Sequence, residues 1–293
     1  MHKFVFYLAY PIIWLFSKLP FRILYIISDL MYLLFFYVIG YRKKVVLDNL
    51  RLVYPDKEKK ELIEIQKRFF SHFADSLIEG IKAITISKQS LKKRYTYKNI
   101  ELIDGLYKDG KSVILVSSHY ANWEWVIGLT LHTKIDFYGS YTKIQNKNFE
   151  NLIKDSRSKY GMKCVKSSEI IKGIVTNVKQ QKQGLYLLIS DQSPQVQRNQ
   201  YWAKFLNVNV PIFTGAEMIS KKFDFAVVNM NTTKIKRGYY ESNFELITDT
   251  PKELAKNTIT NTYLRLTEEH IYKQPSFYLW SHKRFKHRDK APK

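Results

Sequence analysis

The sequence has only one cysteine, Cys164. A single cysteine excludes an intramolecular disulfide and a cysteine metal cluster, and gives no sign of a secreted domain held together by disulfides. Because Cys164 follows Met162 and Lys163 in a segment that reads as a short strand, we interpret it as a core residue rather than a catalytic thiol. The sequence also lacks an internal repeat, a low-complexity linker and the Gly-x-Ser-x-Gly motif of serine hydrolases. It therefore predicts one large domain, or one domain with an appendage.

Acidic residues are scarce. The 48 Lys and Arg residues exceed the 26 Asp and Glu residues and give a net charge of +22. A field of this sign attracts polyanions, which include nucleic acid, anionic lipid headgroups and acidic proteins. No recognised nucleic-acid motif is present, and an apolar amino-terminal segment has no role in such binding. We therefore expect no nucleic-acid partner. Salt-dependent binding to duplex DNA, but not to anionic vesicles, would favour that rival function.

The amino-terminal region lacks a clean membrane span. Phe4–Phe16 is an apolar run of 13 residues, and Ile23–Gly40 is one of 18 residues that contains Asp29, whereas a spanning helix needs about 20 apolar residues. No small-residue cleavage site of a signal peptide follows. The run is rich in Tyr and Trp and precedes a basic cluster at 42–44, a pattern typical of a membrane interface. We predict a membrane-associated helical segment at 1–45 and a catalytic domain at 46–293. An ordinary buried pair of helices is the alternative.

Hydrophobic periodicity predicts an α/β domain. Apolar residues recur at three- and four-residue steps over Glu61–Ile84, which indicates an amphipathic helix. The sequence Thr250–Glu253 matches a capping box with proline at the first helical position, and predicts a helix to about Tyr272. Further elements are predicted as strands at Ser112–Val116, Ile135–Tyr141, Leu185–Ser190, Phe225–Asn231 and Tyr239–Ile247, and as helices at Asn122–Leu131, Phe149–Tyr160 and Glu169–Lys182. This alternation favours a mixed central sheet flanked by helices.

The residues from Ser117 to Trp125 carry the strongest sign of chemistry. His119 lies at the carboxyl end of a predicted strand, where open α/β sheets usually place their sites. On an ideal helix Glu124, five residues later, is rotated by about 140° from His119. The two side chains meet if His119 lies in the turn and Glu124 in the first helical turn, with Asn122 near the N-cap. Glu124 would then accept a hydrogen bond from one imidazole nitrogen and orient His119 as a general base.

The segment His-Tyr-Ala-Asn-Trp-Glu resembles the HX4D/E motif of glycerolipid acyltransferases. Its surroundings most closely resemble the lipid A biosynthesis (lauroyl/myristoyl) acyltransferases, which typically have His-aromatic-Gly-Asn-Trp-Glu. Ala121 stands in place of that glycine, and we expect this change only to narrow the turn. The resemblance implies a glycerol-3-phosphate acyltransferase-like fold with an amino-terminal apolar helical membrane segment.

The resemblance extends along most of the chain. The similar blocks are Tyr41–Val46 with Asn49–Arg51, Arg157 ahead of Gly161, Asp191-Gln192, Pro211 through Thr214-Gly215, and Trp280–Lys286. By resemblance, Asn122, Arg157, Asp191, Gln192, Thr214 and Gly215 support the substrate or the transition state. Two of these residues have a structural reading as well: Arg157 as a solvated surface charge, and Asp191 as a cap or turn residue. The basic tail from Lys283 is read either as a solvated end or as a contact for lipid phosphates or an acidic carrier protein.

The implied activity is transfer of a fatty acyl group from a thioester to a lipid hydroxyl. The resemblance implies an acyl-acyl carrier protein donor (or acyl-CoA), a lipid A precursor as acceptor, no cofactor or metal, and a position on the cytoplasmic face of the inner membrane. One departure is that Tyr141-Thr142-Lys143 stands where relatives often have Tyr-Arg-Pro. This keeps open another lipid acceptor, such as an aminolipid or a lysophospholipid. A non-catalytic module that binds a membrane surface is the remaining alternative.

Overall fold

The computed structural model describes residues 2–196 and 200–291. The α-helices are α1 (His2–Lys18), α2 (Phe21–Leu33), α3 (Lys43–Val53), α4 (Lys59–Ala83), α5 (Lys88–Arg94), α6 (Glu101–Lys108), α7 (Lys147–Ser158), α8 (Ile170–Lys179), α9 (Gly215–Phe223) and α10 (Thr258–Lys273). The strands are β1 (Tyr95–Lys98), β2 (Val113–Ser117), β3 (Phe137–Tyr141), β4 (Lys163–Lys166), β5 (Leu185–Ile189), β6 (Trp202–Phe205), β7 (Val208–Pro211), β8 (Ala226–Lys236) and β9 (Tyr239–Thr248). A π-helix, η1 (Leu34–Ile39), continues α2, and the 3₁₀ helices are η2 (Glu124–Leu131), η3 (Pro251–Glu253), η4 (Pro275–Phe277) and η5 (Arg288–Lys290).

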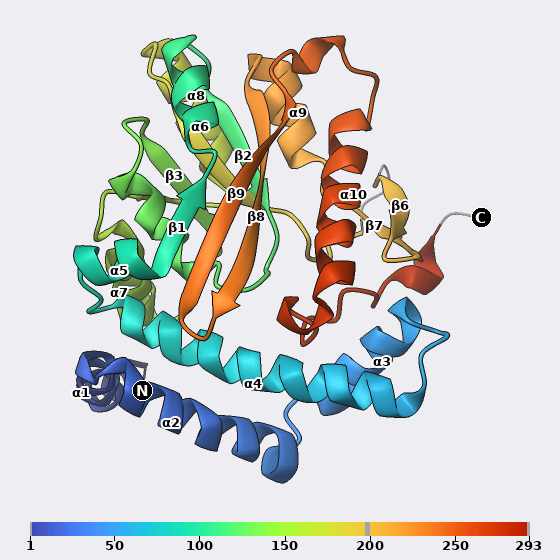
Figure 1. The fold of residues 1–293 in the computed structure, drawn as a ribbon. Coiled ribbons are helices and arrows are strands. Elements are labelled where there is room, and N and C mark those ends of the chain that lie inside the picture. Colours follow the sequence, from blue (N-terminus) through green and yellow to red (C-terminus); the bar gives the residue numbers. More distant parts are fainter. Residues whose placement is uncertain (1, 197–199, 292–293) are drawn as a thin grey trace.

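A mixed sheet of seven strands lies at the centre, in the order β1-β9-β8-β2-β5-β3-β4. From β8 to β4, each strand is parallel to the next one in this order, whereas β9 is antiparallel to β8. Strands β6 and β7 form a separate antiparallel hairpin. Helices flank the sheet, with α10 beside β8 (Figure 1). The predicted α/β class and mixed central sheet are confirmed.

Strand β2 explains where the chain places His119. Its sequence is Val-Ile-Leu-Val-Ser, and all five side chains are buried between neighbouring strands and the helices on both faces. A strand covered on both faces is expected to be continuously apolar rather than alternating. Each fully buried Val, Leu or Ile contributes about 1.5–3 kcal/mol to the free energy of unfolding. The strand ends at Ser117, and His119 follows at its carboxyl end.

Helix α4 crosses this edge of the sheet, and α2 runs alongside it (Figure 1). A capping box between Glu58 and Glu61 fixes its start. The predicted amphipathic helix is therefore confirmed. The composition of its buried face differs from the prediction, because Asp75 and Glu79 are buried whereas Leu77 is exposed.

The amino-terminal helices expose most of their apolar side chains, so they do not form a buried hairpin. Helix α2 buries Leu24 and Ser28, and η1 buries Phe36. Together α2 and η1 form Phe21–Ile39, a helical segment of 19 residues that is long and apolar enough to cross a membrane by length and composition. Large exposed apolar residues on this part of the chain are Val5, Tyr7, Leu8, Ile12, Trp14, Leu15, Ile23, Ile26, Leu30, Leu33, Leu34, Tyr37, Val38 and Ile39.

Several local predictions need correction. Thr250 makes no capping hydrogen bond, and Pro251–Glu253 is a single 3₁₀ turn; helix α10 begins only at Thr258, after Asn257 in the left-handed region. The helix predicted from Asn122 is a 3₁₀ helix that begins at Glu124. Cys164 does lie on a short strand, but it is half-buried rather than a core residue. The other predicted strands and helices appear with ends shifted by a few residues.

Candidate active site

The turn after β2 is tightly constrained. Ala121 has a φ of 51°, in the left-handed region that glycine adopts most readily. The expectation that alanine in place of glycine only narrows the turn therefore meets a backbone conformation in which glycine would be less strained. The backbone N–H of Ala121 donates to the carbonyl of Phe277, and Leu279 N–H donates to the carbonyl of His119 (3.0 and 3.1 Å). The carboxy-terminal segment therefore holds both sides of the turn.

The imidazole of His119 is paired with Asp191. Its Nδ1 lies 2.8 Å from Asp191 Oδ1, and the carboxylate is only 1% exposed. Burial alone would raise the pKa of Asp191, but the charge of His119 and its hydrogen bond outweigh burial and hold that pKa below its ordinary value. An ionised carboxylate at Nδ1 keeps a proton on that nitrogen, so Nε2 carries the lone pair. The arrangement is that of an oriented general base.

Gln192 and Trp123 lie around the free nitrogen. The Gln192 side-chain nitrogen is 3.3 Å from His119 Nε2, and the Trp123 ring packs edge-on to the imidazole with 5.4 Å between ring centres. With Nδ1 protonated, the amide of Gln192 donates to Nε2.

Glu124 does not contact the imidazole, contrary to the expectation from its spacing. Its two carboxylate oxygens accept hydrogen bonds from Arg157 Nη2 and Nε, at 2.6 and 3.0 Å. The reason is local geometry: Glu124 is the first residue of η2, and its side chain reaches across to α7, whereas Asp191 follows the strand that pairs with β2. Burial lowers the pKa of Arg157, but the charge of Glu124 and its hydrogen bonds raise that pKa by more than burial lowers it, so the net shift is upward.

A cavity of about 630 Å³ opens at these groups. His119, Glu124, Arg157, Gln192 and Gly215 line it together with Trp123, so five of the predicted site residues share one space. Much of the remaining wall is apolar and includes Val126, Ile127, Ile144, Ile153, Met162, Ile170, Ile171, Leu187, Leu188, Ile189, Phe213 and Ile219. Polar residues also line it, among them Ser140, Tyr141, Thr142, Glu150, Ser167, Ser190 and Ser193. The apolar part of this wall suits a hydrocarbon chain.

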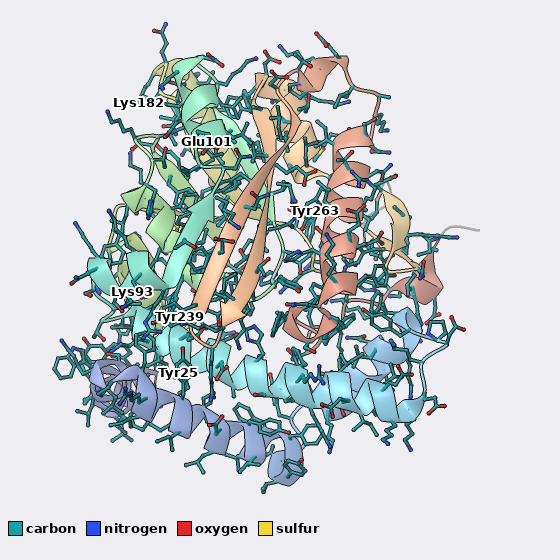
Figure 2. The ribbon with its side chains drawn as sticks, in the orientation of Figure 1. Tyr25, Lys93, Glu101, Lys182, Tyr239 and Tyr263 are labelled. Atoms are coloured by element: carbon teal, nitrogen blue, oxygen red, sulfur yellow. The ribbon has the colours of Figure 1, made fainter. Side chains whose placement is uncertain are left out.

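The other predicted residues have different positions. Gly215 lines the cavity at the start of α9, and Thr214 directly precedes that helix without a side-chain capping bond. Asn122 is buried behind the turn and does not line the cavity; its Oδ1 accepts from the backbone N–H of Trp125 (2.9 Å). Of the segment Tyr141-Thr142-Lys143, the first two residues line the cavity. Figure 2 shows Tyr263 on α10, whose hydroxyl donates to the carbonyl of Ser117 at the end of β2 (2.7 Å).

Sequence reasoning missed His282 and treated Trp123 as a packing residue. His282 Nε2 accepts a hydrogen bond from the backbone N–H of Ser193 (3.2 Å), directly after the Asp191-Gln192 pair. Burial lowers the pKa of His282 to about 4, so this imidazole is neutral at pH 7. The basic tail is also not entirely solvated, because Arg284 is buried and donates to the carbonyl of Pro211. The similarity of the Trp280–Lys286 block was the available signal for these contacts.

Two of the blocks that carry the family resemblance, the one around Arg42 and Asn49 and the one at Trp280–Lys286, contact each other. Asn49 Nδ2 donates to the carbonyls of Trp280 and His282 (2.8 and 2.9 Å), and Arg42 Nη1 donates to that of Ser281 (2.9 Å). The α/β fold, the His119–Asp191 pair and the cavity together supply the arrangement that an enzyme with a general base and a largely apolar substrate requires.

The family follows from comparison with known proteins. The family model of the bacterial lipid A biosynthesis acyltransferases matches residues 1–287, so the chain belongs to this family of acyl-transferring enzymes. No curated protein matches the chain.

Proposed function

We propose that the protein transfers a fatty acyl chain from an acyl thioester to a hydroxyl of a lipid A precursor, with His119 as the general base. The observation that carries this proposal is the 2.8 Å contact between His119 Nδ1 and buried Asp191, with His119 lining a cavity whose wall contains many apolar side chains. Asp191 keeps the proton on Nδ1, so Nε2 accepts the proton of the acceptor hydroxyl. The role first assigned to Glu124, orientation of the imidazole, passes to Asp191.

The reaction then proceeds without a covalent enzyme intermediate. The hydroxyl oxygen attacks the thioester carbonyl while its proton passes to His119 Nε2, and a C–O bond forms. The tetrahedral intermediate collapses, the C–S bond breaks, and the proton passes from the imidazolium to the leaving thiolate. Arg157, held by Glu124 on the cavity wall, is placed to interact with the developing negative charge or with a phosphate of the acceptor.

The donor is proposed to be acyl-acyl carrier protein. A net charge of +22 suits an acidic carrier protein, and acyl-CoA is the alternative thioester. Residues 1–45 are proposed to associate with the membrane, since the apolar side chains of α1, α2 and η1 are exposed. The basic residues Arg42, Lys43 and Lys44 follow η1 within this segment and favour the cytoplasmic face. Co-sedimentation with anionic vesicles tests the association, and a protein that stays in solution contradicts it.

The His119→Ala variant tests the mechanism. General-base catalysis contributes roughly 10²- to 10⁴-fold, so the transfer rate should fall by that factor while the fold persists. His132→Ala, the same substitution at an exposed histidine outside the cavity, is the matched control and should retain the wild-type rate. Wild-type transfer by purified His119→Ala protein would refute the proposed base.

The acceptor is tested separately by mass spectrometry of lipids from a deletion strain. Loss of one acyl chain from lipid A supports the lipid A precursor. Unchanged lipid A with an altered aminolipid or lysophospholipid favours the second acceptor class, for which the specific observation is Thr142 at the cavity wall where relatives often carry arginine. In that case the same base and cavity act on a different hydroxyl.

A further inference from the structure

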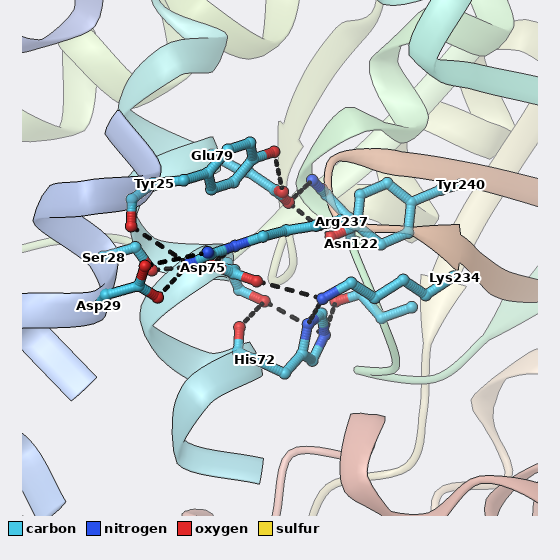
Figure 3. Close-up of polar contacts among 12 residues, drawn as sticks. Tyr25, Ser28, Asp29, His72, Asp75, Glu79, Asn122, Lys234, Arg237 and Tyr240 are labelled. Carbon is cyan, nitrogen blue, oxygen red and sulfur yellow. Dashed lines mark hydrogen bonds and ion pairs between the residues drawn. The ribbon is translucent and has the colours of Figure 1, made fainter. Parts of the chain in front are cut away.

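Helix α4 buries three titratable side chains directly behind the active-site turn. His72, Asp75 and Glu79 lie at successive turns of the helix and face the β8–β9 hairpin and helix α2 (Figure 3). None of the three lines the cavity at His119. The proposed mechanism does not use them, although burial of charged groups is costly unless they are paired or hydrogen-bonded.

Asp75 has cationic partners in this cluster. Lys234 Nζ lies 3.1 Å from its Oδ2, and Arg237 donates to its Oδ1 through Nε and Nη2 (2.9 and 2.7 Å). Ser28 on α2 donates to the same carboxylate (2.8 Å). This part of the cluster is a charge-compensated junction between α2, α4 and the β8–β9 hairpin.

Glu79 is different, because no Lys or Arg within the described residues forms an ion pair with its carboxylate. It accepts hydrogen bonds from Asn122 Nδ2 (2.7 Å), the Tyr240 hydroxyl (2.7 Å) and the Tyr25 hydroxyl (2.8 Å). Its backbone carbonyl accepts from Trp125 Nε1 (3.0 Å). Burial, together with the charge of Asp75, raises the pKa of Glu79 to about 7. The carboxylate therefore depends on these neutral donors.

The donor Asn122 connects Glu79 to the catalytic turn. Asn122 lies between His119 and Glu124, and its Oδ1 caps the backbone N–H of Trp125 at the start of η2 (2.9 Å). With Nδ2 on Glu79 and Oδ1 on the helix start, both ends of its amide are fixed. His72 Nε2 adds a contact 3.2 Å from the carbonyl of Ala121, the residue with positive φ. Helix α4 thus holds the turn at its strained residue and at the start of η2.

We propose that Glu79 is a positioning residue for acyl transfer: through Asn122 it fixes the turn that carries His119 and Glu124, and through Tyr25 it ties helix α2 to that turn. The inference rests on the proposed function of His119. It places the apolar amino-terminal helix α2 within the framework of the active site, because the Tyr25 hydroxyl and the Asn122 amide share one buried carboxylate.

The test uses Glu79→Gln, Asn122→Asp and the double variant, in the full-length protein with its lipid acceptor. Glu79→Gln is close in shape but leaves one acceptor oxygen where Glu79 has two, so it cannot accept from both the Asn122 amide and the Tyr25 hydroxyl, which bind different oxygens of the carboxylate. Asn122→Asp places a carboxylate against Glu79. A small displacement of reacting groups can cost about 10²-fold, so we expect kcat to fall roughly 10- to 100-fold in each single variant, with KM for both substrates within about twofold. The double variant restores one amide-to-carboxylate hydrogen bond with donor and acceptor exchanged, and should recover most of kcat.

The matched control is Glu64→Gln, which makes the same substitution at an exposed residue of α4 that pairs with Arg68. It should retain the wild-type kcat. All rates are expressed per folded protein, as measured by circular dichroism and thermal unfolding. If Glu79→Gln does not fold, Asn122→Asp tests the same hydrogen bond from the other side.

A merely structural role predicts lower yield or unfolding temperature, unchanged kcat per folded molecule and no recovery in the double variant; that result overturns the proposal. The outcome is separate from the fate of the general base. If His119→Ala is inactive while Glu79→Gln and Asn122→Asp have wild-type kcat, only the positioning role fails. If His119→Ala has the wild-type rate, the proposed function fails first.

Discussion

Replacing Asp191 with asparagine is the sharpest perturbation of the proposed base. The substitution keeps the size of the side chain but removes the charge that lies 2.8 Å from His119 Nδ1. A hydrogen bond to a charged group contributes about 1.5–3 kcal/mol. At about 1.4 kcal/mol per tenfold in rate, its loss corresponds to roughly 10- to 150-fold.

A second effect adds to this loss. The new amide can donate to Nδ1, which moves the imidazole proton to Nε2 and blocks that nitrogen as an acceptor. Since the general base is worth roughly 10²- to 10⁴-fold, we expect kcat of Asp191→Asn to fall within that range. KM should change little, because the buried carboxylate does not line the cavity.

The assay is transfer of a labelled acyl chain from carrier-protein thioester to the lipid acceptor, at saturating concentrations of both. Asp136→Asn is the matched control, since Asp136 forms an ion pair with Lys163 at the far edge of the sheet. A folded Asp191→Asn enzyme with kcat within about threefold of the wild type would refute the reasoning. Glu124, rather than Asp191, would then have to be the partner of the imidazole during turnover.

Three further predictions concern the surroundings of the base. Glu124→Gln and Arg157→Gln both break the same ion pair, so their effects on kcat/KM in a double-mutant cycle should be strongly non-additive. Additive losses would contradict a shared role. The folded-state pKa of His282, about 4, lies below its ordinary 6.5, so its contribution to the free energy of unfolding is complete above pH 6.5 and is lost as the pH falls towards 4. The free energy of unfolding of His282→Gln, measured in urea, should therefore fall less over this interval, and an unchanged pH slope would contradict this. A methyl group on Gly139 would lie 2.9 Å from the flexible end of Met162, so Gly139→Ala should push that side chain into the cavity and shift product mass spectra to shorter acyl chains; an unchanged chain-length profile would contradict this.

Much of the fold follows from local patterns in the sequence. The apolar run of β2, the amphipathic repeat of α4 and the strand that ends before Asp191 all occur where periodicity predicts them. The predicted start of a helix at Thr250 was wrong. A capping pattern describes only the first turn, and here that turn, η3, ends in extended backbone at Leu254, so α10 starts only later.

The pairing of His119 was not predictable from spacing alone. The distance of five residues pointed to Glu124, but the partner is set by strand order, which places β5 beside β2 and brings the residues after both strands together. Sequence similarity singled out Asp191 without indicating its contact. The burial of Glu79 was not predictable for a related reason. A glutamate in an amphipathic helix normally faces solvent, and only the packing of α2 and β9 against α4 buries this one.

The hydrogen bonds from Leu279 to His119 and from Ala121 to Phe277 set an order of events during synthesis. The apolar helices α1 and α2 leave the ribosome long before the segment that holds the catalytic turn. The amino-terminal helices of a nascent chain are thus complete while the turn that carries the imidazole still lacks these two contacts. Both hydrogen bonds can form only after residues 277–279 have been translated and have packed against the turn.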